Sequence, residues 1–258
     1  MISVLSDMMS YTFIVRAMIV GGLVALCSAL LGVSLVLKRY SMIGDGLSHV
    51  AFAALTIAVA MNVAPLYIST PIVTVAAIIL LRLSENSKIK GDSAIALIST
   101  VSIAIGVVVT ALTKGMNTDV YSYMFGSILA MSESDVYMSI ALSVVVIILF
   151  VFFYNKIFAV TFDESFAKAT GTKADVYNMI IAVLTAITIV VGMRIMGTML
   201  ISSLIIFPAL ISMRNFKTFK SVIICSAIVS VVCFLLGIIL SYLYSIPTGA
   251  SIVLVNTV

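Results

Sequence analysis

Charge is scarce in this sequence. Charged residues make up 9% of its 258 residues and hydrophobic residues 63%, whereas soluble domains average about 25% and about 45–50% respectively. A soluble core cannot bury that much apolar surface. The composition therefore excludes a water-soluble globular domain and indicates a protein that lies in a membrane.

Several motifs are also missing. The three cysteines, Cys27, Cys225 and Cys233, lie in apolar runs without C-x-x-C spacing, so we expect buried side chains and no thiol metal site. No G-x-x-x-x-G-K-[ST] sequence occurs, so this chain does not bind ATP through a P-loop. The amino-terminal residues lack a basic region, so we expect no cleavable signal peptide and a first span that acts as its own insertion signal.

The sequence does contain a series of long uncharged runs. Lipid offers backbone N–H and C=O groups no partners, so runs of about 20 apolar residues cross a bilayer as helices. The short alternating segments of a β-barrel are absent. We therefore predict an all-α polytopic membrane protein with one domain, residues 1–258, and eight or nine transmembrane helices. Eight spans are expected at residues 12–37, 43–61, 66–81, 93–113, 136–154, 177–194, 196–213 and 221–243.

Two breaks between spans depend on turn residues. Asn62 to Pro65 interrupts one apolar run and Ser245 to Gly249 another, because Pro and Gly end helices. Pro208 predicts a kink in its own span. The apolar tail, residues 248–258, is too short to cross alone; it is either a half-helix or part of a segment that continues beyond it.

Basic residues predict the orientation, because cytoplasmic loops carry an excess of Lys and Arg. With the amino terminus outside, only Arg16, Lys114 and Arg194 of the 14 basic residues fall elsewhere than in cytoplasmic segments. The cytoplasmic ones are Lys38, Arg39, Arg82, Lys88, Lys90, Lys156, Lys168, Lys173, Arg214, Lys217 and Lys220. The positive charge is thus explained by orientation in the bilayer, and no nucleic-acid partner is expected.

Two segments between spans differ from simple loops. Residues 114–135 contain an apolar stretch that is too short to cross, so we expect it to be re-entrant or to lie at the outer surface, with Asp119 near the outer mouth of a pathway. Residues 155–177 form the longest hydrophilic stretch. This stretch is either a solvated loop or, as its DESFAKA sequence suggests, a short helix against a cytoplasmic partner.

Asp45 and the only histidine, His49, lie four residues apart in an apolar span. Residues at i and i+4 project from one face of a helix, so the carboxylate and the imidazole can converge on one point. An ionisable side chain within a membrane is costly unless it is paired or faces water, which makes both residues functional candidates. Their oxygen and nitrogen ligands suit Zn²⁺ or Mn²⁺. Gly44 and Gly46, beside the aspartate, allow another helix or an ion to come close.

The residues alone leave other interpretations of this pair open. The two side chains could form a hydrogen-bonded structural pair, or relay protons in a secondary carrier, or Asp45 could cap its helix. An intramembrane hydrolase that uses His49 has less support, because the sequence has no H-E-x-x-H and no convincing nucleophile motif.

Five blocks of sequence resemble one known family, the integral permease subunits of bacterial ABC importers for zinc, manganese and iron (the zinc-uptake permease type, ABC-3). The blocks are KRYSMIGDGLSHVAFAAL at 38–55, TDVYSYMFGSILAMS at 118–132, FDESFAKATGTKADVYNM at 162–179, RIMGTMLISSLIIFPAL at 194–210 and YSIPTGASIVL at 244–254. The family's G-D-x-x-x-H motif, which is associated with the metal pathway, falls on Gly44, Asp45 and His49.

The resemblance implies partners as well as a site. Family members work as two permeases bound to two cytoplasmic ATPases, and an extracytoplasmic metal-binding protein supplies the ion. The implied metal residues are Asp45, His49 and Asp119; Ser127 stands where some zinc members have a further aspartate. The implied ATPase-coupling residues lie within 155–177 and are Asp163, Glu164, Phe166, Ala167 and Gly171.

These inferences together predict a transport subunit and not an enzyme. We expect it to import divalent zinc or manganese across a bacterial cell membrane, with a second copy of the permease beside it and no permanently bound cofactor. The alternative is a self-contained, proton-coupled carrier in which Asp45 and His49 form the relay.

Overall fold

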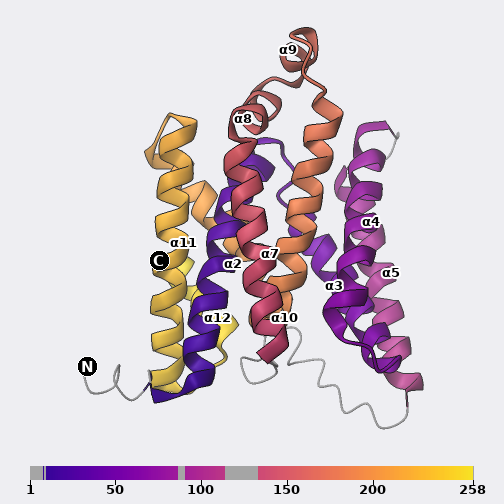
Figure 1. Ribbon diagram of the computed structural model, residues 1–258, viewed down its shortest axis with the longest axis vertical. Helices are drawn as coiled ribbons and strands as arrows, with labels where there is room; N and C mark the ends of the chain where they lie inside the picture. Colours follow the sequence, from indigo (N-terminus) through magenta and orange to yellow (C-terminus); the bar gives the residue numbers. More distant parts are fainter. Residues whose placement is uncertain (1–7, 9, 87–90, 114–132, 258) are drawn as a thin grey trace.

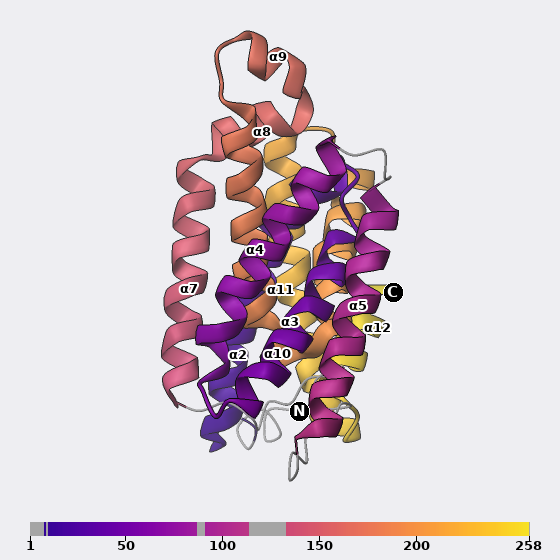
Figure 2. The same ribbon diagram turned by 90° about the vertical axis from the view of Figure 1, so that its right-hand side faces the viewer.

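The structure is a computed structural model that describes residues 8, 10–86, 91–113 and 133–257. Within these ranges every regular element is a helix, and eight helical segments are long and apolar enough to cross a membrane. The long helices lie side by side in one elongated bundle (Figures 1 and 2). The all-α polytopic fold predicted from the sequence is therefore confirmed.

The helices cross the bundle in alternating directions (Figure 1). The amino-terminal half contains α2 (Thr12–Leu37), α3 (Ile43–Ala60), α4 (Pro65–Asn86) and α5 (Gly91–Leu112). The carboxy-terminal half contains the long helices α7 (Glu133–Phe152), α10 (Ala174–Asn215) and α11 (Phe219–Tyr244). It also contains the short helices α8 (Tyr154–Phe162), α9 (Glu164–Ala169) and α12 (Thr248–Thr257). Each predicted span coincides with one long helix or with one half of α10.

The turns predicted from local sequence are present. Asn62 has a φ of 54° and Ser245 a φ of 53°, so both adopt the left-handed conformation that commonly follows the end of a helix. α12 contains 10 residues and packs against α10 and α11. The described part of the tail is thus a short helix beside the carboxy-terminal long helices (Figures 1 and 2).

α10 contains 42 residues and has two segments long enough to cross, Ala174–Met193 and Met196–Asn215. The chain turns between them at Gly197, whose φ of 81° and ψ of 169° are readily adopted only by glycine. Gly197 is the one residue of α10 with a non-helical backbone, so the kink predicted at Pro208 is accompanied by no departure from helical dihedrals. The break between the two spans therefore depends on the glycine.

α2, α3 and α10 form the centre of the bundle, whereas α5 and α7 lie at its periphery. Gly32 allows a close contact between α2 and α10 in the centre, because a Cβ at this position would lie 2.1 Å from the carbonyl oxygen of Ile205. The peripheral helix α5 exposes apolar side chains such as Leu97 and Val108. Exposed apolar surface of this extent is expected where a protein contacts lipid.

Helices α8 and α9 project from one end of the bundle (Figure 1). The sequence prediction of a short helix within DESFAKA is confirmed by α9, but α8 was missed, because its nine residues follow α7 with only Phe153 between them. The predicted re-entrant stretch, including Asp119 and Ser127, lies outside the described residues.

Candidate metal-ion site

Asp45 and His49 lie in the first two turns of α3, the shortest of the long helices at 18 residues. α2 ends at Leu37, and Arg39 then adopts a left-handed φ of 62°. The Tyr40 N–H donates to the carbonyl of Leu35 at 2.8 Å, which closes a tight turn before α3 begins. The turn thereby places both ionisable side chains at the end of α3 that is nearest to α8 and α9.

The two side chains face each other without a direct hydrogen bond. His49 Nε2 lies 3.7 Å from Asp45 Oδ2, and the side chains are 22% and 42% exposed respectively. A satisfied structural pair would be buried, with the two atoms about 2.7–3.0 Å apart. The observed geometry leaves carboxylate and imidazole lone pairs accessible from one side of the helix. Side chains that coordinate a metal ion need such accessible lone pairs.

Asp45 does not cap its helix. The residue at the capping position of α3 is Met42, without a side-chain hydrogen bond, and Asp45 is the third residue of the helix. A negative charge in the first turn is still favoured by the helix dipole. Ser48, one turn on, donates its hydroxyl to the backbone carbonyl of Asp45 at 2.7 Å and so does not occupy the carboxylate.

The glycines beside Asp45 allow α3 to contact two neighbouring helices closely. A Cβ on Gly46 would lie 2.7 Å from Cγ2 of Ile95 in α5, and one on Gly44 would lie 3.0 Å from Cδ1 of Ile205 in α10. The expectation that these glycines permit close approach of another helix agrees with these contacts. The backbone on either side of Asp45 is therefore packed against α5 and α10.

Within the described residues, no third His, Cys, Asp or Glu joins Asp45 and His49 to form a metal-binding group. One further polar atom lies close by: Ser99 Oγ is buried, has no hydrogen-bond partner in the described part of the chain, and would be 3.5 Å from a Cβ on Gly46. The site thus offers two side-chain ligands, an incomplete shell that suits an ion in passage more than one bound permanently.

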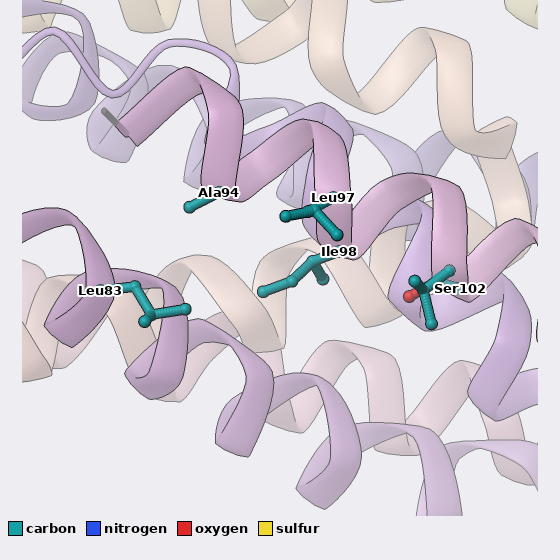
Figure 3. A pocket seen from close by; sticks show the side chains of 6 residues that line it. Leu83, Ala94, Leu97, Ile98 and Ser102 are labelled. Carbon is teal, nitrogen blue, oxygen red and sulfur yellow. The ribbon is translucent and has the colours of Figure 1, made fainter. Parts of the chain in front are cut away.

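A separate pocket between α4 and α5 has a different character (Figure 3). Its lining is apolar except for Ser102, and it includes Leu83 from α4 and Leu97 and Ile98 from α5. Among the described residues, its lining has no acidic side chain and no histidine, so its chemistry suits a hydrocarbon chain more than a cation.

The predicted coupling residues lie on and around α9. Asp163 caps this helix, because its carboxylate accepts a hydrogen bond from the Phe166 N–H at 2.9 Å. Phe166 is 65% exposed, whereas Ala167 is buried against Val160 and Ala174. Gly171 has a φ of 78° and terminates the turn that leads into α10. α9 thus presents an aromatic side chain outward while one alanine anchors it.

Glu164 begins α9 and joins an ionic network. Its carboxylate lies 3.3 Å from Lys38 Nζ and 3.0 Å from Lys168 Nζ, and it accepts a hydrogen bond from the Asn178 amide at 3.1 Å. Burial raises the pKa of Glu164, but the hydrogen bonds from Asn178 and Lys168 and the charge of Lys38 outweigh burial and lower the pKa to about 2. Lys168 also pairs with Asp175, 3.0 Å away, and these two acids raise its pKa.

Sequence reasoning missed two members of this network. In the sequence, Lys38 served only as one of the basic residues that predict the orientation in the membrane. Its side chain is in fact just 10% exposed. Asn178 is 3% exposed in the first turns of α10. An amide at the start of an apolar span was a signal that could have identified it, because a buried polar group needs a partner.

The fold defines the class, a polytopic membrane protein. A model of the ABC 3 transport family matches residues 10–258, and the chain belongs to this family. Its sequence is 26% identical over 250 residues to the manganese transport system membrane protein MntC of Halalkalibacterium halodurans, covering 96% of this chain and 85% of the relative. It is also 29% identical over 240 residues to the high-affinity zinc uptake system membrane protein ZnuB of Haemophilus influenzae, covering 92% and 91%.

A solved structure is similar along the whole chain. One chain of PsaBC from Streptococcus pneumoniae, in complex with Fab, superimposes with a TM-score of 0.89 at 27% identity, covering 100% of this chain and 93% of that one. The resemblance stated from the sequence blocks is thereby confirmed: the chain is a membrane-spanning permease subunit, and so a transport protein.

Proposed function

We propose that this permease imports a divalent transition-metal ion, Mn²⁺ or Zn²⁺, into the bacterial cytoplasm, and that the ion passes between Asp45 and His49. The observation that carries the proposal is the accessible carboxylate–imidazole pair, 3.7 Å apart, in the first turns of a central helix. Permeases named for manganese and for zinc are both similar to the chain along nearly its whole length, which supports this class of ion.

The ligand chemistry agrees with both metals. An imidazole nitrogen and a carboxylate oxygen bind Zn²⁺ well, and Mn²⁺ accepts the same atoms. Two ligands hold an ion more weakly than a complete shell, so an ion that enters can also leave. Asp119, which the order of the spans predicts near the outer mouth and the family resemblance implies as a metal residue, would bind the ion earlier on the same route.

Energy for transport comes, in this proposal, from a separate cytoplasmic ATPase dimer, since the chain has no P-loop. Helix α9, with Asp163, Glu164, Phe166, Ala167 and Gly171 on or beside it, is the docking element. Its exposed Phe166 is an apolar anchor of the kind that interfaces enrich. A second copy of the permease and an extracytoplasmic metal-binding protein complete the importer in the cell membrane.

The test is metal uptake by cells that lack their own manganese and zinc importers and express this chain with its ATPase and binding protein. We expect accumulation of Mn²⁺ or Zn²⁺, but not of Ca²⁺ or Mg²⁺, measured by mass spectrometry. Uptake should continue after the proton gradient is collapsed while ATP is maintained. Uptake that stops with the proton gradient would instead support a proton-coupled carrier that uses Asp45 and His49 as the relay.

A further inference from the structure

The polar network at the cytoplasmic end joins three elements at one buried cation. Lys38, the residue that follows α2, has a side chain only 10% exposed. Its ammonium contacts Glu164 of α9 at 3.3 Å and also donates to the Asn178 side-chain oxygen in α10. Asn178 in turn donates to the same Glu164 oxygen at 3.1 Å. The three side chains therefore form a closed triangle between α2, α9 and α10.

On its other side, Lys38 borders the start of the helix that carries the candidate ion site. A narrow cavity is lined by Lys38 together with Tyr40, Ile43, Leu81 and Asn178, so the ends of α2 and α4 and the starts of α3 and α10 meet there. The Ile43 N–H donates to the carbonyl of Tyr40 at 3.0 Å. Residues 38–43 are thus a short hydrogen-bonded connection that ends two residues before Asp45.

Apart from this triangle, the Lys168–Asp175 ion pair attaches α9 to α10. The apolar contact of α9 is the small cluster of Ala167 with Val160 and Ala174, which is separate from the main core. A buried charge resists separation from its partner, because each would be left uncompensated. When α9 moves, Glu164 therefore carries Lys38 with it or loses its 3.3 Å contact with the ammonium, and rigid elements transmit such displacements.

We propose that Lys38, Glu164 and Asn178 act as a positioning link that transfers the movement of α9 to the α2–α3 turn and so to Asp45 and His49. The link deepens the proposed function and rests on it, since it gives the route by which an ATPase docked at α9 reaches the ion site. None of the three residues touches the ion. They act through the placement of α3.

The test uses the full chain in lipid nanodiscs and, in parallel, the complete complex in proteoliposomes. Lys38→Met removes the cation at similar size, and Glu164→Gln keeps hydrogen bonding but removes the charge. Lys156→Met is the matched control, because Lys156 is an exposed lysine on α8. Hydrogen exchange is followed at residues 38–50 and 164–178, and Mn²⁺ or Zn²⁺ imported per ATP hydrolysed is measured in the vesicles.

The link predicts that either variant raises exchange in both segments together, by about fivefold or more. It also predicts that ions imported per ATP fall by about tenfold, while ATP hydrolysis and complex assembly persist. Lys156→Met should change neither quantity. A merely structural role would lower the amount of complex and leave the ratio of ions to ATP unchanged.

The proposal is overturned if Lys38→Met and Glu164→Gln each alter exchange only in their own segment, or if the ratio of ions to ATP stays at the wild-type value. If the wild-type complex imports neither ion, the proposed function is wrong, and the exchange measurement still decides whether α9 and the α2–α3 turn are linked. Should Lys38→Met fail to fold, Glu164→Gln alone gives both readouts.

Discussion

At the scale of single residues, Gly46 determines how closely α3 approaches α5. Replacing it with alanine puts a Cβ 2.7 Å from the branched methyl group of Ile95, so the two helices must separate. We expect Gly46→Ala to lower the free energy of unfolding by roughly 1–3 kcal/mol, the usual cost of overpacking. Thermal unfolding of the purified chain in detergent measures the change, and metal uptake should fall with it because Asp45 moves.

Gly22 provides the matched control for this prediction. It also lies within a membrane helix, α2, but nothing is within 4 Å of the Cβ that alanine would add. Gly22→Ala should therefore leave stability unchanged or raise it by about 0.5–1 kcal/mol. Equal unfolding temperatures for the two variants would show that Gly46 is not a contact point.

Glu164 gives the clearest pH dependence. Its pKa is lowered from 4.5 to about 2 in the folded chain, so the ionised carboxylate stabilises the placement of α9 fully above about pH 4.5. This contribution is lost as the pH falls towards 2. We expect α9 to stay ordered between about pH 5 and about pH 8 and to loosen only on further acidification.

The chain contains no tryptophan, so a Phe166→Trp variant would place its single tryptophan, which can be excited selectively, on α9. Its anisotropy should be constant near neutral pH and decrease below about pH 4.5. Adding Glu164→Gln should remove that pH dependence. A decrease between neutral pH and pH 5 would show that some other group controls α9.

At the scale of elements, α9 depends on its cap. Its six residues are too few for a helix to persist alone, and Asp163 supplies the hydrogen bond to the Phe166 N–H. Asp163→Ala should cost about 1 kcal/mol and lead to rapid hydrogen exchange across residues 164–169. ATPase association should weaken in parallel, measured by co-purification.

A cap on a long helix provides the contrast. Thr218 accepts from the Ser221 N–H at the start of α11, which has 26 residues packed against the bundle. Thr218→Ala should therefore speed hydrogen exchange only in the first turn of α11. If both substitutions produced equally local effects, α9 would be held by contacts other than its cap.

At the scale of the whole molecule, the sequence predicted the membrane spans well because their signal is physical and local. A run of apolar residues as long as α2 or α11 has one stable form in lipid, and Asn62 and Ser245 mark breaks through their own backbone preference. The approximate positions of the eight spans followed from the apolar runs, and two of the breaks followed from the turn residues. The position of α8 did not, since its nine residues are too few for a membrane span and only Phe153 separates it from α7.

The candidate site was predictable only in part. Asp45 and His49 were identifiable because an ionisable pair is rare in an apolar span, and their shared face follows from helical periodicity. Lys38 and Asn178 could not be paired with Glu164, because 126 residues separate Lys38 from Glu164 and their contact depends on the packing of α2, α9 and α10. Tertiary contacts of that kind leave no periodic trace in the sequence.

The central claim is that a divalent metal ion crosses the membrane between Asp45 and His49. ATP-dependent uptake of Mn²⁺ and Zn²⁺ into proteoliposomes containing the complete complex tests it most directly. The comparison is between the wild type, the Asp45→Asn/His49→Gln double variant and the control Thr56→Val. The Thr56 hydroxyl that this control removes donates to the Ala53 carbonyl on the same helix. We predict that the double variant assembles normally but imports at least about tenfold less metal, whereas Thr56→Val imports normally; wild-type uptake by the double variant would contradict the claim.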